Sequence, residues 1–113
     1  MPYIDIKVSK CLDDTSKENL QKEIADNISI IPGKKPANTT ICICDCCTFY
    51  REYEKIEAAF IEVRLYKESP LENKTEFAKK MFSIIENTLS IPPSKTQINF
   101  LEMPMWASNG EVF

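Results

Sequence analysis

The proline at position 2 is the residue of this sequence with the least common chemistry. Pro2 follows Met1, and removal of Met1 would turn its ring nitrogen from a peptide nitrogen into a secondary amine. A neutral amine can act as a base, and burial favours the neutral form because it disfavours charge. The chain contains no His, so the commonest general base is absent. Many proteins begin with Met-Pro, however, so a catalytic Pro2 needs partners elsewhere in the chain.

Cysteines are the second group of residues that could do chemistry. The five are Cys11, Cys42, Cys44, Cys46 and Cys47. Thiolate clusters bind soft metals, but alternate residues of one strand lie about 6.6 Å apart, too far for one ion without a partner strand or subunit. Free cysteines also pack as small apolar groups. We expect packing, with metal or redox chemistry as the alternative. The odd count fits a secreted disulfide framework poorly, which favours a reducing cytoplasm.

Composition excludes several classes of function. The 113 residues suit one compact domain, here residues 1–113. The formal charge is −3 without a basic block, which argues against nucleic acid as the partner. No apolar run approaches the roughly 18 residues of a membrane span, and no signal peptide is visible. We therefore expect no membrane partner.

The first half of the chain has the pattern strand, helix, strand. Residues 2–8 alternate apolar and polar, which predicts a half-buried strand. Asp13 begins a stretch typical of a helix start, and apolar residues then recur at helical spacing as far as Ile31, before Pro32-Gly33. A second strand is predicted over residues 39–47, with Cys42, Cys44 and Cys46 on one face.

The second half repeats this order. Residues 48–57 have no clear period and are read as a connecting excursion, with at most a short edge strand. Alternation over 59–66 predicts a third strand, and 96–101 a fourth. Between them a helical apolar stripe contains Phe77, Met81, Ile84, Ile85 and Leu89.

The two halves therefore predict a duplicated α/β (α+β) fold. The segment from Asn27 to Lys34 is echoed by Asn87 to Lys95, each just before a strand. Two tandem βαβ units, about 2–47 and 58–102, would form one four-stranded mixed sheet with two helices on one face. The other face carries polar and charged side chains, which favours contact with solvent or another subunit.

Three segments give the chain a resemblance to a known family. Residues 2–6, 33–36 and 98–103, spaced as they are, resemble the tautomerase superfamily, and within it the macrophage migration inhibitory factor and phenylpyruvate tautomerase group. The resemblance implies a tautomerase-like domain, a cytoplasmic homotrimer with active sites at subunit interfaces, and an isomerase without metal or cofactor. Its substrate would be a small-molecule carboxylate.

The resemblance also assigns roles to individual residues. Pro2 matches the catalytic proline, and Lys34 the lysine that meets the substrate carboxylate. Asn99 matches an asparagine contributed by a neighbouring subunit, and Trp106 and Phe113 correspond to aromatic residues at the pocket mouth. Lys34 could equally be a solvated lysine after a helix, and Asn99 a strand residue satisfied by local hydrogen bonds.

Three positions depart from the family pattern. Gln97 stands where a tyrosine is usual, and Tyr66 where an isoleucine is usual. Arg64 is predicted on the same strand face as Tyr66, Gln97 and Asn99. It could bind a substrate carboxylate, or it could pair with Glu62 or Asp5 at a subunit contact, which is the interpretation we favour.

These residues lead to three hypotheses. In the first, Lys34 holds a 2-oxo acid while neutral Pro2 moves a proton between its enol and keto forms and Asn99 stabilises the enolate. In the second, Pro2 and Arg64 carry out a dehalogenation or decarboxylation. In the third, the chain is a trimeric binding protein without turnover, in which Met1 is retained.

Overall fold

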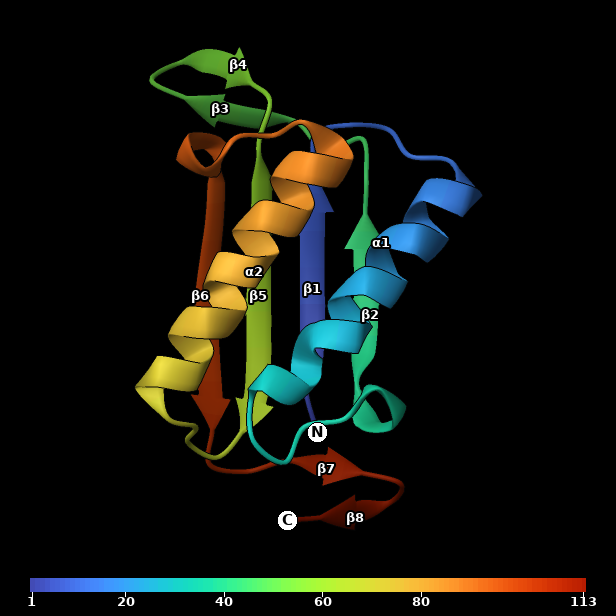
Figure 1. The fold of residues 1–113 in the computed structure, drawn as a ribbon, viewed down its shortest axis with the longest axis vertical. Helices are drawn as coiled ribbons and strands as arrows, with labels where there is room; N and C mark the ends of the chain where they lie inside the picture. Colours follow the sequence, from blue (N-terminus) through green and yellow to red (C-terminus); the bar gives the residue numbers. More distant parts are fainter.

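A four-stranded mixed sheet with two helices on one face forms the body of the molecule, seen in a computed structural model that describes residues 1–113 (Figure 1). Its strands are β1 (Tyr3–Val8), β2 (Thr40–Cys44), β5 (Ala59–Tyr66) and β6 (Thr96–Met103). Their order is β2-β1-β5-β6. β1 is parallel to β2, β5 is parallel to β6, and β1 runs antiparallel to β5. The expected pair of βαβ units in one mixed sheet is confirmed.

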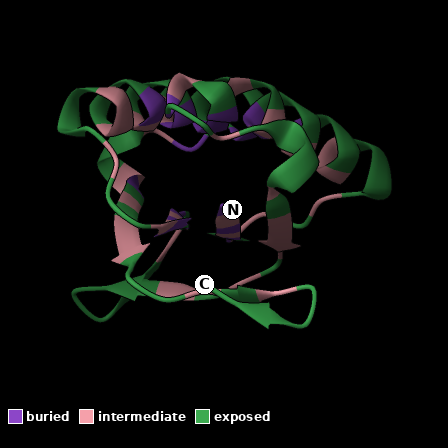
Figure 2. Cartoon of the chain, turned by 90° about the horizontal axis from the view of Figure 1, so that it is seen from below, coloured by how far each residue is buried: buried purple, intermediate pink, exposed green.

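Alternation along the strands places the hydrophobic core on one face of the sheet. Every second residue of β1 and β5 is buried, beginning with Ile4 and Ala59. Seventeen buried residues form a single core cluster between the sheet and the helices. Figure 2 shows the buried positions gathered between these two layers. The opposite face of the sheet lies outside this core.

The first helix is shorter than its apolar spacing predicts. α1 (Asp14–Asn27) begins where the Asp13 carboxylate accepts a hydrogen bond from the Ser16 N–H at 2.7 Å. The expected helix continued to Ile31, but the α-helix ends at Asn27 and a 3₁₀ turn, η1 (Ile28–Ile30), follows. The tighter turn keeps both Ile28 and Ile31 fully buried. The spacing of apolar residues therefore predicted correctly which residues are buried, but not that the last turn is a 3₁₀ helix.

The second helix agrees with its predicted stripe. α2 (Leu71–Leu89) buries all five of the residues predicted to face the core. It ends at Ser90, whose backbone is left-handed and whose N–H donates to the Glu86 carbonyl. Short 3₁₀ turns, η2 (Pro36–Asn38) and η3 (Pro93–Lys95), then lead into β2 and β6. Neither helix has both the length and the apolarity that crossing a membrane requires.

The cysteine-rich segment departs from the expected strand. β2 ends at Cys44 rather than at residue 47, and Cys46 has a left-handed backbone and forms a disulfide with Cys11. The Asp45 carboxylate beside it accepts the Leu12 N–H at 2.7 Å. Cys46 is therefore neither a strand residue nor a packed thiol. Sequence spacing missed this because the bond joins two loops that meet only in the folded chain.

Two hairpins stand apart from the main sheet. One pairs β3 (Phe49–Arg51) with β4 (Glu54–Ile56), and the other pairs β7 (Ala107–Ser108) with β8 (Glu111–Val112). They lie at opposite ends of the strands, on the side of the sheet away from the helices (Figures 1 and 2). The turn residues of both hairpins have positive φ, as two-residue hairpin turns require. For residues 48–57 we expected at most one short edge strand, and the structure has two.

Glu102 makes the turn between β5 and α2 sensitive to pH. Its carboxylate accepts hydrogen bonds from the Lys74 ammonium at 2.8 Å and from the Ser69 N–H at 2.6 Å. These two groups, Lys74 first, hold the pKa of Glu102 below its usual value. The stabilisation is therefore present above the pKa of the unfolded chain and is lost as the pH falls through the lower, folded pKa.

We expect Glu102→Gln to lower the free energy of unfolding at pH 7 by about 1–2 kcal/mol. The difference from wild type should be smaller at pH 3, which lies below the pKa of the unfolded chain, because the stabilisation is lost as the pH falls from that pKa through the lower, folded one. Urea unfolding at both pH values measures it, with Glu111→Gln as a control at an exposed carboxylate in β8. A deficit of equal size at both pH values would contradict this account.

Candidate active site at the start of the first strand

A cleft of about 660 Å³ opens where β1 and β2 begin and β5 and β6 end. Its wall includes Pro2, Arg64 and Trp106. Polar groups are supplied by the segment before β2 and by the β7–β8 hairpin, through Asn38, Thr39, Thr40 and Ser108. The cleft therefore combines a candidate base, a cation, an aromatic ring and small hydrogen-bonding groups.

Pro2 is buried at the edge of this cleft. Its carbonyl accepts the Thr40 N–H at 3.1 Å, which ties the start of β1 to the start of β2. The chain described here begins at Met1, so the nitrogen of Pro2 is a peptide nitrogen and the amine belongs to Met1. Burial and then the charge of Lys34 hold the pKa of the Met1 amine below its ordinary value. The same surroundings would favour a neutral amine on Pro2.

Lys34 lies near the amino terminus. It follows Gly33, whose positive φ allows the chain to turn between the helical segment and β2. The Lys34 ammonium donates to the Tyr66 carbonyl at 3.4 Å. Lys34 is thus part of the electrostatic surroundings of the amine, although it does not line the cleft.

Trp106 and Phe113, the two aromatic residues expected at the pocket mouth, lie in different places. Trp106 lines the cleft, whereas Phe113 packs on Tyr66, with ring centroids 5.9 Å apart. Tyr66 itself is outside the cleft wall and carries the Lys67 ammonium 5.1 Å from its ring centroid. Neither Tyr66 nor Phe113 therefore lines the cleft, and Tyr66 contacts Lys34 through its carbonyl.

Arg64 satisfies both interpretations of its role. Its guanidinium contacts the Glu62 carboxylate at 3.0 Å, the pairing we favoured, while Asp5 pairs instead with Lys7 at 2.7 Å. Arg64 also lines the cleft and lies 5.8 Å from the Tyr3 ring. Because the side chain is nearly half exposed, the ion pair contributes little stability and leaves the guanidinium free to bind an anion.

Gln97 and Asn99 are not brought to the cleft of their own chain. Strand register places Gln97 opposite Phe60 and Asn99 opposite Glu62, whereas Arg64 lies opposite Leu101. Gln97 lines a separate cavity of about 140 Å³ beside the β3–β4 hairpin. Both side chains are exposed on the face of the sheet that carries Arg64.

Several cleft residues were not anticipated from the sequence. Tyr3 lines the cleft, and a hydrogen bond with the Cys42 side chain, with burial, raises the pKa of its hydroxyl. Its position next to Pro2 could have identified Tyr3 as a cleft residue. Ser108 and Met105 belong to the tail that folds back over the sheet, and no local pattern indicated that return.

Comparison with known proteins confirms the expected fold. No protein-family model and no curated protein sequence matches the chain. Among solved structures it is similar to MIF2 of Leishmania major, with a TM-score of 0.91 at 19% identity over 100% of this chain and 97% of that one. The macrophage migration inhibitory factor-like protein of Entamoeba histolytica has a TM-score of 0.85 at 18% identity, over 99% and 98%. Pt0534 inactivated by 2-oxo-3-pentynoate has 0.84 at 15%, over 96% and 93%. The chain thus has the fold of macrophage migration inhibitory factor and the tautomerases.

We expect Lys34→Met to raise the pKa of the amino-terminal amine, because it removes the neighbouring cation that disfavours a second positive charge. The pH dependence of the α-amino nitrogen chemical shift in labelled protein measures this pKa. Lys35→Met is the matched control, because Lys35 is the adjacent, exposed lysine. An unchanged pKa in Lys34→Met, or an equal rise in the control, would contradict this role for Lys34.

Proposed function

We propose that the chain is a cofactor-free tautomerase that interconverts the enol and keto forms of a small, phenylpyruvate-like 2-oxo acid. The observation that carries this proposal is the buried Pro2 at the edge of a cleft, beside cations, in a chain with this fold. Removal of Met1 would expose the secondary amine of Pro2 at that edge. A structure of similar fold, Pt0534, was inactivated by a 2-oxo acid, which supports the same class of ligand here.

Two cations are available for the substrate carboxylate. Arg64 lines the cleft and presents a planar guanidinium, which binds carboxylates in a bidentate manner. Lys34 lies close enough to the amino terminus to lower the pKa of the amine there. We assign the carboxylate to Lys34, with Arg64 as a second contact, so that the carbon next to the carbonyl faces Pro2.

Proton transfer then requires only the amine and hydrogen-bond donors. Neutral Pro2 takes a proton from one position of the 2-oxo acid and returns it at another, so that the enol and keto forms exchange without net gain or loss of atoms. Charge that develops on the enolate oxygen is stabilised by a donor at the cleft, for which the Thr40 hydroxyl is available. Positioned proton transfer of this kind contributes about 10²–10⁴-fold in rate.

A second subunit would complete the site. Asn99 is exposed and lies away from Pro2 in its own chain. Its assigned role therefore requires Asn99 of a partner subunit, and we propose a homotrimer with active sites at the subunit interfaces. The β6 edge of the polar face, where Asn99 lies, and the two hairpins beneath that face offer the contact surface (Figure 2). Gln97 lies on the same exposed face and would act from the partner in the same way.

A dehalogenase-like or decarboxylase-like reaction is the alternative that one observation favours. Arg64 reaches the cleft wall while keeping only a weak surface ion pair. In such an enzyme Arg64 would polarise the substrate rather than assist in binding it.

Cytoplasmic residence also stays a prediction. The Cys11–Cys46 disulfide counts against it, because disulfides persist mainly in oxidising compartments.

The central experiment compares wild type with Pro2→Ala in the ketonisation of enol-phenylpyruvate, after intact mass has shown that Met1 is absent from both. We expect the variant to lose about 10²–10⁴-fold in kcat/KM, because a primary amine replaces the cyclic secondary amine. Equal rates would contradict the proposal. A natural chain that retains Met1 would favour the trimeric binding protein instead.

Arg64→Ala separates the two enzymatic assignments when ketonisation is measured beside dehalogenation and decarboxylation of unsaturated or oxo acids. A tautomerase that relies on Lys34 should show mainly a higher KM, whereas the alternative reaction should be abolished. Arg51→Ala is the control, because Arg51 contacts the Ser94 carbonyl near the opposite end of the sheet.

Mixed trimers test the shared site. Pro2→Ala and Asn99→Ala chains should each be nearly inactive alone, because each lacks one part of the site. Co-expressed and purified as mixed trimers, they should recover part of the wild-type activity, since some interfaces pair an intact Pro2 with an intact Asn99. No recovery in verified mixed trimers would show that both residues act within one chain.

A further inference from the structure

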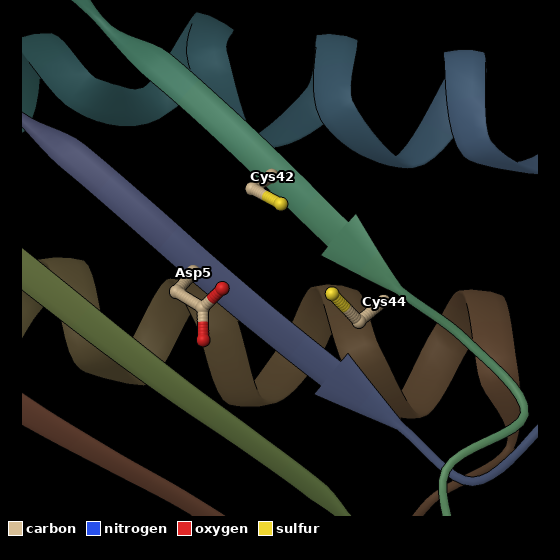
Figure 3. A group of neighbouring side chains, drawn as sticks. All are labelled: Asp5, Cys42 and Cys44. Carbon is tan, nitrogen blue, oxygen red and sulfur yellow. The ribbon is translucent and has the colours of Figure 1, made fainter.

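Three potential metal ligands meet on the bare face of the sheet, outside the cleft. Asp5 extends from β1, and Cys42 and Cys44 extend from β2 (Figure 3). One ligand atom from each of the three residues lies within 4.8 Å of the other two. None of the three belongs to the hydrophobic core cluster or to the cleft wall.

Strand register explains why these side chains meet. β1 and β2 are parallel, and Asp5 lies opposite Cys42 while Lys7 lies opposite Cys44. Residues two apart on a strand share a face, so both thiols point to the side where Asp5 points. The sequence placed the two cysteines too far apart for one ion unless another strand contributed, and β1 is that strand.

We propose that Asp5, Cys42 and Cys44 form a binding site for Zn²⁺. Two thiolates and a carboxylate are zinc ligands, and a water molecule would complete the tetrahedron. Both thiols release their protons to solvent when the ion binds. The site would link β2, at the edge of the sheet, to β1 in its interior.

The required movement is small. With Zn–S bonds of about 2.3 Å, two sulfurs on one tetrahedral ion are about 3.8 Å apart. Ligand atoms that already lie within 4.8 Å need to close by only about 1 Å. All three side chains are half-buried, which leaves them room for such a rotation and leaves an ion free to enter.

Charge at the site also matches a divalent cation. Two thiolates and the Asp5 carboxylate carry three negative charges, and Zn²⁺ together with the Lys7 ammonium supplies three positive ones. Lys7 contacts Asp5 at 2.7 Å but is about half exposed, so it can keep or yield that contact at little cost. Glu62, the neighbour of Asp5 on β5, is paired with Arg64 and does not need the ion.

The other cysteines are outside this site. Cys11 and Cys46 are joined to each other. The Cys47 thiol donates to the Cys44 carbonyl at 3.5 Å, so its side chain is satisfied by the backbone. Packing was the role expected for the cysteine run, but Cys42 and Cys44 lie outside the core. Cys47 is the matched control that the chain offers.

Cobalt titration of the full chain tests the proposal, without thiol reductant and under inert gas. We expect one Co²⁺ per chain, with a thiolate-to-cobalt charge-transfer band and the visible bands of a tetrahedral ion, all displaced by Zn²⁺. Cys42→Ser and Cys44→Ser should each weaken binding by at least about tenfold and reduce the charge-transfer band. Asp5→Asn should weaken binding but keep that band, and Cys47→Ser should change nothing.

Alkylation of the wild-type protein supplies a test that needs no variant. Zn²⁺ should slow alkylation of Cys42 and Cys44 at least about tenfold, mapped by mass spectrometry, and leave the rate at Cys47 unchanged. The proposal is overturned if cobalt shows no thiolate band, if one ion binds per three chains, or if Zn²⁺ protects all three thiols equally.

Discussion

The antiparallel pairing of β1 with β5 is the contact on which the rest of the molecule depends. Each βαβ unit on its own is a pair of parallel strands with one helix. Joining the halves through β1 and β5 creates one core beneath both helices. Because this one pairing is antiparallel, the starts of β1 and β2 and the ends of β5 and β6 lie at the same end of the sheet.

That meeting point is where the candidate active site lies. Pro2 comes immediately before β1, Arg64 is near the end of β5, and Trp106 follows β6. Lys34 approaches from the turn before β2 and adds a positive charge beside the amine. Four strand ends and one turn therefore bring the candidate base and two cations together.

The two faces of the sheet carry different kinds of side chain. The face under the helices carries the alternating apolar residues and supplies the stability. The other face is released from packing and holds ion pairs, exposed amides and the group formed by Asp5, Cys42 and Cys44. Polar and charged side chains can be placed there without a cavity being opened in the core.

Local pattern was sufficient for the order of the four main strands and two helices and for the core. Period two along β1 and β5, and the helical stripe from Phe77 to Leu89, are set by which side must be buried, so the buried positions could be predicted residue by residue. Pro2 could also be singled out from its place next to the amino terminus, and Lys34 from the family resemblance; the roles of both stay predictions.

Tertiary structure alone decided which distant residues touch. The Cys11–Cys46 bond, the group of Asp5 with two cysteines, and the separation of Asn99 from Pro2 all depend on register and loop paths. A shift in the register of β1 against β2 would separate Asp5 from Cys42 and Cys44 without changing the apolar and polar pattern of either strand. Sequence periodicity specifies the side on which a residue lies, whereas only the folded sheet specifies its neighbour.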